Sequence, residues 1–237
     1  SAQLGLTTAL VERDKLGGIC LNWGCIPTKA LLRAADIRDT LHDADNFGLS
    51  YSDTNFDIQK IVKRSREVAA HLSKGVEYLL NKNKVHIIKG EGRFAKNNKI
   101  KITNTDNQTT TIYSYKNAII ATGAQAKSLP NIVQPSSNSI WTYKEAMIPK
   151  SLPKSLLVIG GGAIGVEFAS FYLRFGVPVT LIEGMSRILP SEDEEISQLA
   201  TKQFNDQGMV IKTNSTLKSL KTARNNSVTA VIQNSNG

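Results

Sequence analysis

Apolar positions in the last third of the chain form two short continuous runs on either side of a stretch with helical spacing. The runs are residues 156–159 (LLVI) and 179–182 (VTLI), and each is typical of a buried parallel strand. Between them, apolar residues from Val166 to Leu173 recur at helical intervals, and this stretch ends near Gly176. Strand, helix and strand in this order predict an α/β fold, to which residues 207–212 and 227–233 are expected to add strands.

The preceding part of the chain shows similar patterns. Apolar residues at helical spacing predict two helices, one from Cys25 through Leu41 and one that Asp57 caps and that extends to Leu80. Short β patterns occupy residues 7–12, 85–88, 99–103, 109–113 and 118–123, with a hairpin turn over 104–108. Prolines 130, 135, 149 and 153 then separate this region from the C-terminal pattern, which predicts a domain boundary near residue 150.

The chain has two cysteines, Cys20 and Cys25, and both lie in residues 17–29, GGICLNWGCIPTK. Pro27 suits the first turn of a helix, so we expect Cys25 at a helix N-terminus. Unpaired N–H groups and the helix dipole favour an anion there and lower the pKa of a thiol. A thiolate that can be regenerated from a disulfide relays electrons, so the pair predicts redox chemistry, with the two sulfurs bonded or within bonding distance.

Other interpretations of the cysteines stay open at this point. The two thiols can be buried and inert, a structural disulfide over so short a loop adds little stability, and a thiol-based redox sensor needs no nucleotide. A zinc site is disfavoured because there is no second cysteine pair and because His42, His71 and His86 show no ligand spacing. We therefore expect no metal site.

A dinucleotide-binding fingerprint follows the first of the two apolar runs. Residues 160–165 read GGGAIG and fit the pattern G-x-G-x-x-G, directly between the predicted strand and the predicted helix. In this pattern Gly160 allows the tight turn, Gly162 lets a pyrophosphate approach the backbone, and Gly165 lets the helix pack closely on the strand. The pyrophosphate is then expected at the helix N-terminus.

The residue after the second run, Glu183, bears on the choice of nucleotide. A carboxylate at this strand end accepts hydrogen bonds from the ribose hydroxyls and repels a 2′-phosphate, so it predicts NAD rather than NADP. Arg187 lies four residues further on, and we expect it to be a solvated surface residue rather than a phosphate ligand.

Residues 17–32 resemble the active-site segment of the pyridine nucleotide–disulfide oxidoreductases, and CLNWGCIPTK is most similar to the dihydrolipoamide dehydrogenases among them. The resemblance implies two Rossmann-like domains, one binding FAD over residues 1–150 and one binding NAD over residues 151–237. Both are expected to be incomplete, with a first strand and glycine turn before Ser1 and a dimerisation domain carrying a His–Glu base after Gly237. The alternatives are an NADPH-dependent reductase of the glutathione or mercuric reductase type and a non-catalytic nucleotide-binding fragment.

The resemblance also implies roles for individual residues. The substrate thiol would attack Cys20, Cys25 would face the flavin, and Lys29 would lie beside the flavin and pair with Glu167. FAD contacts are implied at Glu12, Gly17, Gly18, Cys20, Lys29, Gly92, Thr122, Gly123 and Ala124. NAD contacts are implied at Gly160, Gly161, Gly162, Ala163, Ile164, Gly165, Val166, Glu167 and Glu183.

The same resemblance implies a homodimer that serves a 2-oxoacid dehydrogenase complex, through the lipoyl domain of its dihydrolipoamide acyltransferase. It would do so in the bacterial cytoplasm, or in the mitochondrial matrix of a eukaryote. No stretch approaches the roughly 18 apolar residues of a membrane span, so no membrane association is expected. The net charge of +9 comes from scattered lysines and arginines without a basic block, so nucleic acid is not an expected partner.

Overall fold

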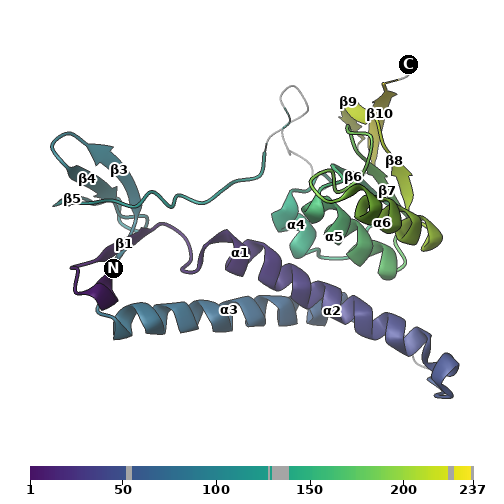
Figure 1. The fold of residues 1–237 in the computed structure, drawn as a ribbon, viewed down its shortest axis with the longest axis horizontal. Helices are drawn as coiled ribbons and strands as arrows, with labels where there is room; N and C mark the ends of the chain where they lie inside the picture. The colour runs from purple at the N-terminus through teal and green to yellow at the C-terminus, as the bar shows by residue number, and fades with distance from the viewer. Residues whose placement is uncertain (52–54, 128, 130–138, 224–226, 236–237) are drawn as a thin grey trace. The chain divides into compact units, whose positions relative to one another are not determined.

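A computed structural model describes residues 1–51, 55–127, 129, 139–223 and 227–235 of the chain (Figure 1). It has two compact units, residues 1–26 with 66–125 and residues 27–65 with 126–237. Two long helices, α2 (Cys25–His42) and α3 (Ile58–Lys82), contribute residues to both units. The boundary expected near residue 150 concerns cofactor binding and stays a prediction, and Pro130 and Pro135 lie outside the described residues.

The first unit contains two small sheets. Strand β1 (Ala9–Glu12) pairs in parallel with β2 (His86–Lys89), and β3 (Glu91–Ala95), β4 (Lys99–Thr103) and β5 (Thr110–Ser114) form an antiparallel sheet in chain order. The turn between β4 and β5 is closed by the Asn104 side chain, whose Oδ1 accepts the N–H groups of Asp106 and Asn107. A 3₁₀ turn (Ala2–Leu4) precedes β1, and the short helix α1 (Gly18–Trp23) precedes α2.

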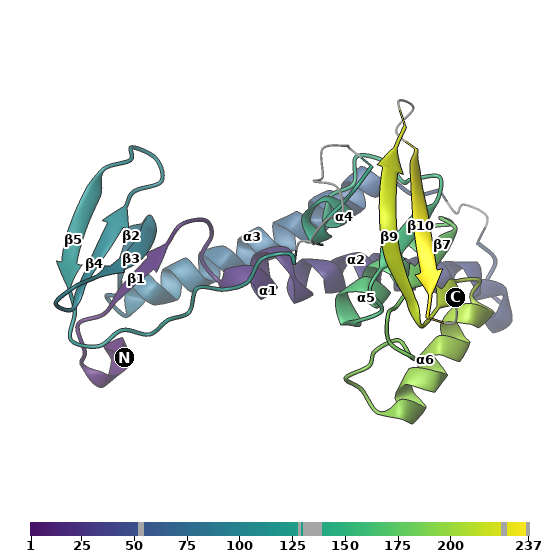
Figure 2. The same cartoon turned by 90° about the horizontal axis from the view of Figure 1, so that it is seen from above.

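The second unit is built around a parallel sheet in the order β6-β7-β8, namely Leu156–Ile159, Val179–Ile182 and Val210–Lys212. Helix α5 (Ala163–Arg174) connects β6 to β7, and α6 (Glu194–Asp206) connects β7 to β8. A long hairpin of β9 (Ser215–Thr222) and β10 (Val228–Asn234) follows (Figure 2). A second 3₁₀ turn (Ala44–Phe47) follows α2, and α4 (Tyr143–Met147) precedes β6.

The core of the second unit is formed by α5 and the sheet. Phe171, Tyr172 and Leu181 are completely buried. Burial raises the pKa of the Tyr172 hydroxyl, which donates a hydrogen bond of 2.6 Å to the carbonyl of Ala146 in α4. A buried hydroxyl needs such a partner, and the bond ties α4 to the central helix.

Most predicted elements are confirmed, with strand ends moved by at most three residues. Strands β6 and β7 have the predicted bounds, and α3 begins after Asp57, whose carboxylate accepts the N–H groups of Gln59 and Lys60. Sequence reasoning did not identify α1, β3, α4 or β9. For α4 a signal was present, because Thr142 and Glu145 form a capping box, which is a recognisable sequence pattern.

The strand predicted for residues 118–123 is wrong. These residues have no regular structure, and the side chains of Ile119 and Ile120 are 86% and 71% exposed. A strand is stabilised by hydrogen bonds to a neighbouring strand, and the sheet of β1 and β2 has two strands in the described part of the chain. An apolar run by itself therefore does not form a strand here.

Candidate functional site

The glycine turn between β6 and α5 has the backbone geometry that the glycine pattern predicts. Gly160 has φ +106°, a left-handed conformation that side chains avoid. A Cβ on Gly165 would lie 2.0 Å from the carbonyl oxygen of Gly160, so the close contact of helix and turn excludes any larger residue. In contrast, a Cβ on Gly162 would have no atom within 4 Å, which leaves the N-terminus of α5 open to a ligand.

Glu183 lies directly after β7 and faces this turn. Its Oε2 accepts the N–H of Gly161 at 2.6 Å, and its Oε1 accepts the N–H of Met185 at 2.8 Å. A Cβ on Gly161 would come within 3.1 Å of the Glu183 Cβ, so the glycine also makes room for the acid. Both carboxylate oxygens are thus fixed at the edge of the open turn, which places a negative charge where a ribose is expected.

The remaining residues of the predicted NAD set lie on the first turns of α5. Ala163 and Ile164 are exposed beside the open glycine turn, with Ile164 65% exposed, whereas Val166 is buried in the core. Glu167 is half-buried, and its Oε1 forms an ion pair with the Nζ of Lys29 on α2. The structure thus contains the Lys29–Glu167 pair that the resemblance implied, one helical turn from the N-terminus of α5.

The cysteines lie on the consecutive helices α1 and α2. Cys20 is in the middle of α1, and Cys25 is the first residue of α2, as its expected place at a helix N-terminus requires. Both are exposed, and no disulfide joins them in the structure, so their pairing stays a prediction. Two glycines with positive φ, Gly17 at +98° and Gly18 at +70°, turn the chain into α1.

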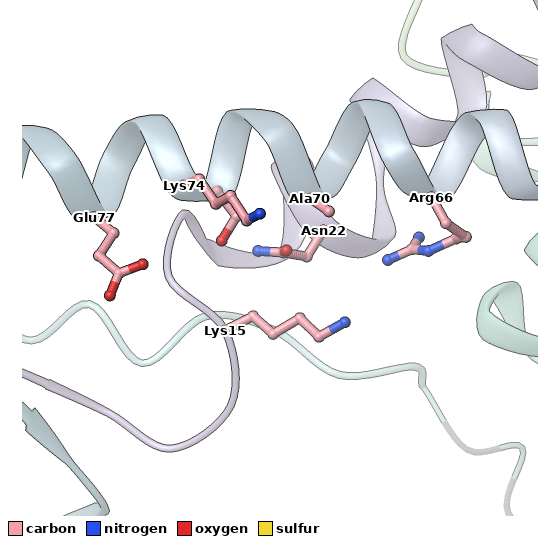
Figure 3. A pocket seen from close by; sticks show the side chains of 7 residues that line it. Lys15, Asn22, Arg66, Ala70, Lys74 and Glu77 are labelled. Atoms are coloured by element: carbon pink, nitrogen blue, oxygen red, sulfur yellow. The ribbon is translucent and has the colours of Figure 1, made fainter.

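A cavity of about 350 Å³ adjoins this segment in the first unit (Figure 3). The side chain of Asn22, only 3% exposed, holds the α1 turn by donating hydrogen bonds to the carbonyls of Leu16 and Gly18. Arg66 stacks 4.1 Å from the ring centroid of Trp23, and burial lowers the pKa of its guanidinium. Sequence reasoning did not identify this lining, which consists of Lys15, Asn22, Arg66, Ala70, Ser73, Lys74 and Glu77.

The residues expected to contact FAD are less organised than the glycine turn. Glu12 ends β1 and accepts the N–H of Asp14 at 2.8 Å. Gly92 lies in β3, where a Cβ would come within 3.0 Å of Ile100 and 3.5 Å of Val11, so close packing explains this glycine. Thr122, Gly123 and Ala124 are exposed in the segment without regular structure. In the described residues there is no cluster of three or more metal-ligating side chains.

Comparison with known proteins gives the family. The family described as pyridine nucleotide-disulphide oxidoreductase matches residues 1–237. Among curated relatives, a dihydrolipoyl dehydrogenase of Zymomonas mobilis is 48% identical over the whole chain and half of its own length, and one of Rhizobium etli is 44% identical over the whole chain and 52% of its own length. The chain belongs to the pyridine nucleotide–disulphide oxidoreductase family and spans about half the length of the curated relatives it matches.

Solved structures agree with the fold. A crystal structure of LpdA from Mycobacterium tuberculosis matches 94% of this chain and 50% of its own, with a TM-score of 0.84 and 25% identity. A Cu(II) complex of the HOCl-induced flavoprotein disulfide reductase RclA from Escherichia coli matches 97% of this chain and 50% of its own, with a TM-score of 0.80 and 27% identity. The predicted Rossmann-like α/β fold is therefore confirmed. No helix in the described part of the chain is long and apolar enough to span a membrane.

Proposed function

We propose that the whole protein is a dihydrolipoamide dehydrogenase, which oxidises dihydrolipoamide with NAD through a redox-active cysteine pair and FAD. The observation that carries this proposal is a single chain with Cys25 at the first position of a helix and a glycine turn closed by the carboxylate of Glu183. The first feature suits a thiolate, and the second suits a dinucleotide without a 2′-phosphate. The dihydrolipoyl dehydrogenases at 44–48% identity support the same assignment.

The cysteines carry out the thiol chemistry in this proposal. One thiolate of dihydrolipoamide attacks the Sγ of Cys20 in the Cys20–Cys25 disulfide, and the Cys25 sulfur leaves as a thiolate favoured by the helix N-terminus. The second substrate thiolate attacks the mixed disulfide, which releases the cyclic disulfide product and the Cys20 thiol. Bound FAD supplies the means of passing the two electrons on as a hydride to NAD.

Other residues would hold the two cofactors. The NAD pyrophosphate would bind at Gly162 and the N-terminus of α5, and Glu183 would accept hydrogen bonds from the ribose hydroxyls. Lys29, held by Glu167, would place a positive charge beside the flavin, where it favours negative charge on the reduced ring. In the FAD site, Glu12 would accept hydrogen bonds from the ribose hydroxyls. Gly17, Gly18, Gly92 and residues 122–124 would lie around the cofactor.

The proposal extends to assembly and location. Residues 1–150 would belong to the FAD domain and residues 151–237 to the NAD domain of a homodimer that serves a 2-oxoacid dehydrogenase complex. The disulfide must be reduced and reoxidised in each turnover, which suits a reducing compartment such as the bacterial cytoplasm. The second candidate is an NADPH-dependent disulfide reductase; the RclA match supports disulfide reduction in general, and Glu183 argues against the 2′-phosphate.

The test uses the full-length protein with dihydrolipoamide and either NAD or NADP. We expect a yellow, flavin-containing protein whose turnover with NAD is lost in both Cys20→Ser and Cys25→Ser. The two variants should still bind NADH with unchanged affinity, because the glycine turn is intact, and this binding is the control for folding. Turnover that survives either substitution would contradict the role of the pair, and equal use of NADP would favour the second candidate.

A further inference from the structure

Helices α2 and α5 are joined by charged side chains at two places in the second unit. The first is the Lys29–Glu167 ion pair. At the second, Arg174 on α5 places its Nη1 2.6 Å from the Oδ1 of Asp36 and its Nε 2.8 Å from the Oδ2 of Asp39, both on α2. Arg174 is 24% exposed, whereas Lys29 is 62% exposed, so the second site is the more shielded one.

The two sites are equally spaced on both helices. Lys29 and Asp36 are seven residues apart, and so are Glu167 and Arg174, which corresponds to about 10.5 Å along each helix axis. The two helices therefore have the same register relative to each other at both sites. The charges are reversed from one site to the other, so sliding α2 by seven residues would bring Lys29 to Arg174 or Asp36 to Glu167. Each of these pairs repels, and the charge pattern specifies one register.

Arg38 reinforces the second site. Its Nη1 donates a hydrogen bond to the backbone carbonyl of Arg174, the last residue of α5. Its guanidinium lies 5.5 and 5.7 Å from the ring centroids of Phe56 and Phe175, which contact each other edge to face. A cation at this position also suits the negative end of the α5 dipole. Residues of α2 therefore contact both parts of Arg174: Asp36 and Asp39 its side chain, and Arg38 its backbone carbonyl.

We infer that Arg174 is a positioning residue, which with Asp36 and Asp39 fixes the register of α2 along α5 and thereby holds Lys29 against Glu167 near the open glycine turn. This inference rests on the proposed nucleotide site, where a neutralised Glu167 matters. A Glu167 carboxylate without its lysine would repel an anionic pyrophosphate at the N-terminus of the same helix. Loss of Arg174 should therefore weaken the binding of a dinucleotide, although Arg174 does not itself contact the dinucleotide.

The two acids are not expected to contribute equally. Burial, with smaller contributions from the negative charges of Asp43 and Asp36, raises the pKa of Asp39, whereas Arg174 and Arg38 lower it. Asp39 also lies 2.8 Å from Arg174, against 2.6 Å for Asp36. Asp36→Asn should therefore loosen the register more than Asp39→Asn does.

The test is a double-mutant cycle on the full-length protein, with the Kd for NADH measured by titration calorimetry. Arg174→Met keeps most of the aliphatic stem and removes the charge, and we expect it to raise the Kd about fivefold or more. In a Lys29→Met background the same substitution should add almost nothing, because the pair that it positions is already lost. Substitutions about 10 Å apart otherwise have additive effects.

Matched variants separate positioning from general stability. Arg93→Met removes an arginine that pairs with Glu91 on the β3–β5 sheet, and it should leave the Kd unchanged. Arg174→Lys keeps the charge without the planar fork that reaches both acids, so it should restore part of the affinity and serves if Arg174→Met does not fold. An unchanged Kd in Arg174→Met, or additive losses with Lys29→Met, would overturn the inference. NADH binding without dihydrolipoamide turnover would instead count against the proposed function alone.

Discussion

Strand β1 ends on Glu12, and Glu183 follows the last residue of β7, but the two carboxylates are held differently. Glu12 accepts the N–H of Asp14 at 2.8 Å, and Glu183 accepts the N–H of Met185 at 2.8 Å. The same two-residue turn thus forms at both strand ends. Only at Glu183 does the second oxygen also accept a backbone N–H in the described residues, that of Gly161 at 2.6 Å.

This difference shows how the carboxylate at a strand end is fixed by its backbone partners. The local turn fixes one oxygen, because it depends only on the strand end and the two residues after it. The second oxygen is fixed by a glycine turn from the neighbouring strand, which requires the assembled β6–α5–β7 unit. Around Glu12 the described residues provide the local turn and the pairing of β1 with β2. The complete arrangement is therefore a property of the strand–turn–helix–strand unit rather than of the glutamate.

The largest effect on stability is expected from Gly165→Ala in the glycine turn that holds Glu183. The new Cβ would lie 2.0 Å from the carbonyl oxygen of Gly160, so α5 must move away from the turn. We expect a loss of about 3–5 kcal/mol in the free energy of unfolding, because the methyl group has no space among backbone atoms. Urea unfolding followed by circular dichroism measures it.

The control for this prediction is Gly162→Ala, three residues earlier in the same turn. Its Cβ would meet no atom within 4 Å, and its φ of −73° is acceptable for alanine. Stability should change by about 1 kcal/mol or less, while NADH affinity should fall because the methyl group occupies the open turn. Equal destabilisation by the two substitutions would show that the close helix contact does not determine the turn.

Sequence reasoning predicted the strand, glycine turn, helix and strand that the structure contains, but not the irregular structure of residues 118–123. Gly160, Gly162, Gly165 and Glu183 act within about twenty residues, so their spacing alone carries the geometry. The Asp36–Arg174 ion pair and the absence of the strand predicted at 118–123 depend instead on contacts between distant segments. No local pattern specifies those contacts. The spacing of apolar residues indicates which face of an element is buried, but it does not indicate which other segment packs against that face.

A second, smaller effect is expected from Glu183→Gln. Glutamine has one side-chain acceptor oxygen, and Glu183 uses two oxygens for two backbone N–H groups. One N–H therefore loses its acceptor, at a cost of about 1–2 kcal/mol in the free energy of unfolding. The variant also loses the negative charge that repels a 2′-phosphate. The ratio of the Kd for NADPH to the Kd for NADH in the full-length protein should fall. An unchanged ratio would show that Glu183 does not determine the preference for NADH.

The smallest effect is expected from the matched substitution Glu12→Gln. Glu12 uses one oxygen for one N–H, that of Asp14, and a glutamine carbonyl can accept the same hydrogen bond. The bond is exposed, so water replaces it at little cost, and we expect a change within about 0.5 kcal/mol in the free energy of unfolding. Urea unfolding of Glu12→Gln and Glu183→Gln side by side provides the comparison. A loss at Glu12 as large as that at Glu183 would mean that the local turn, rather than the glycine turn, dominates the stability of both strand ends.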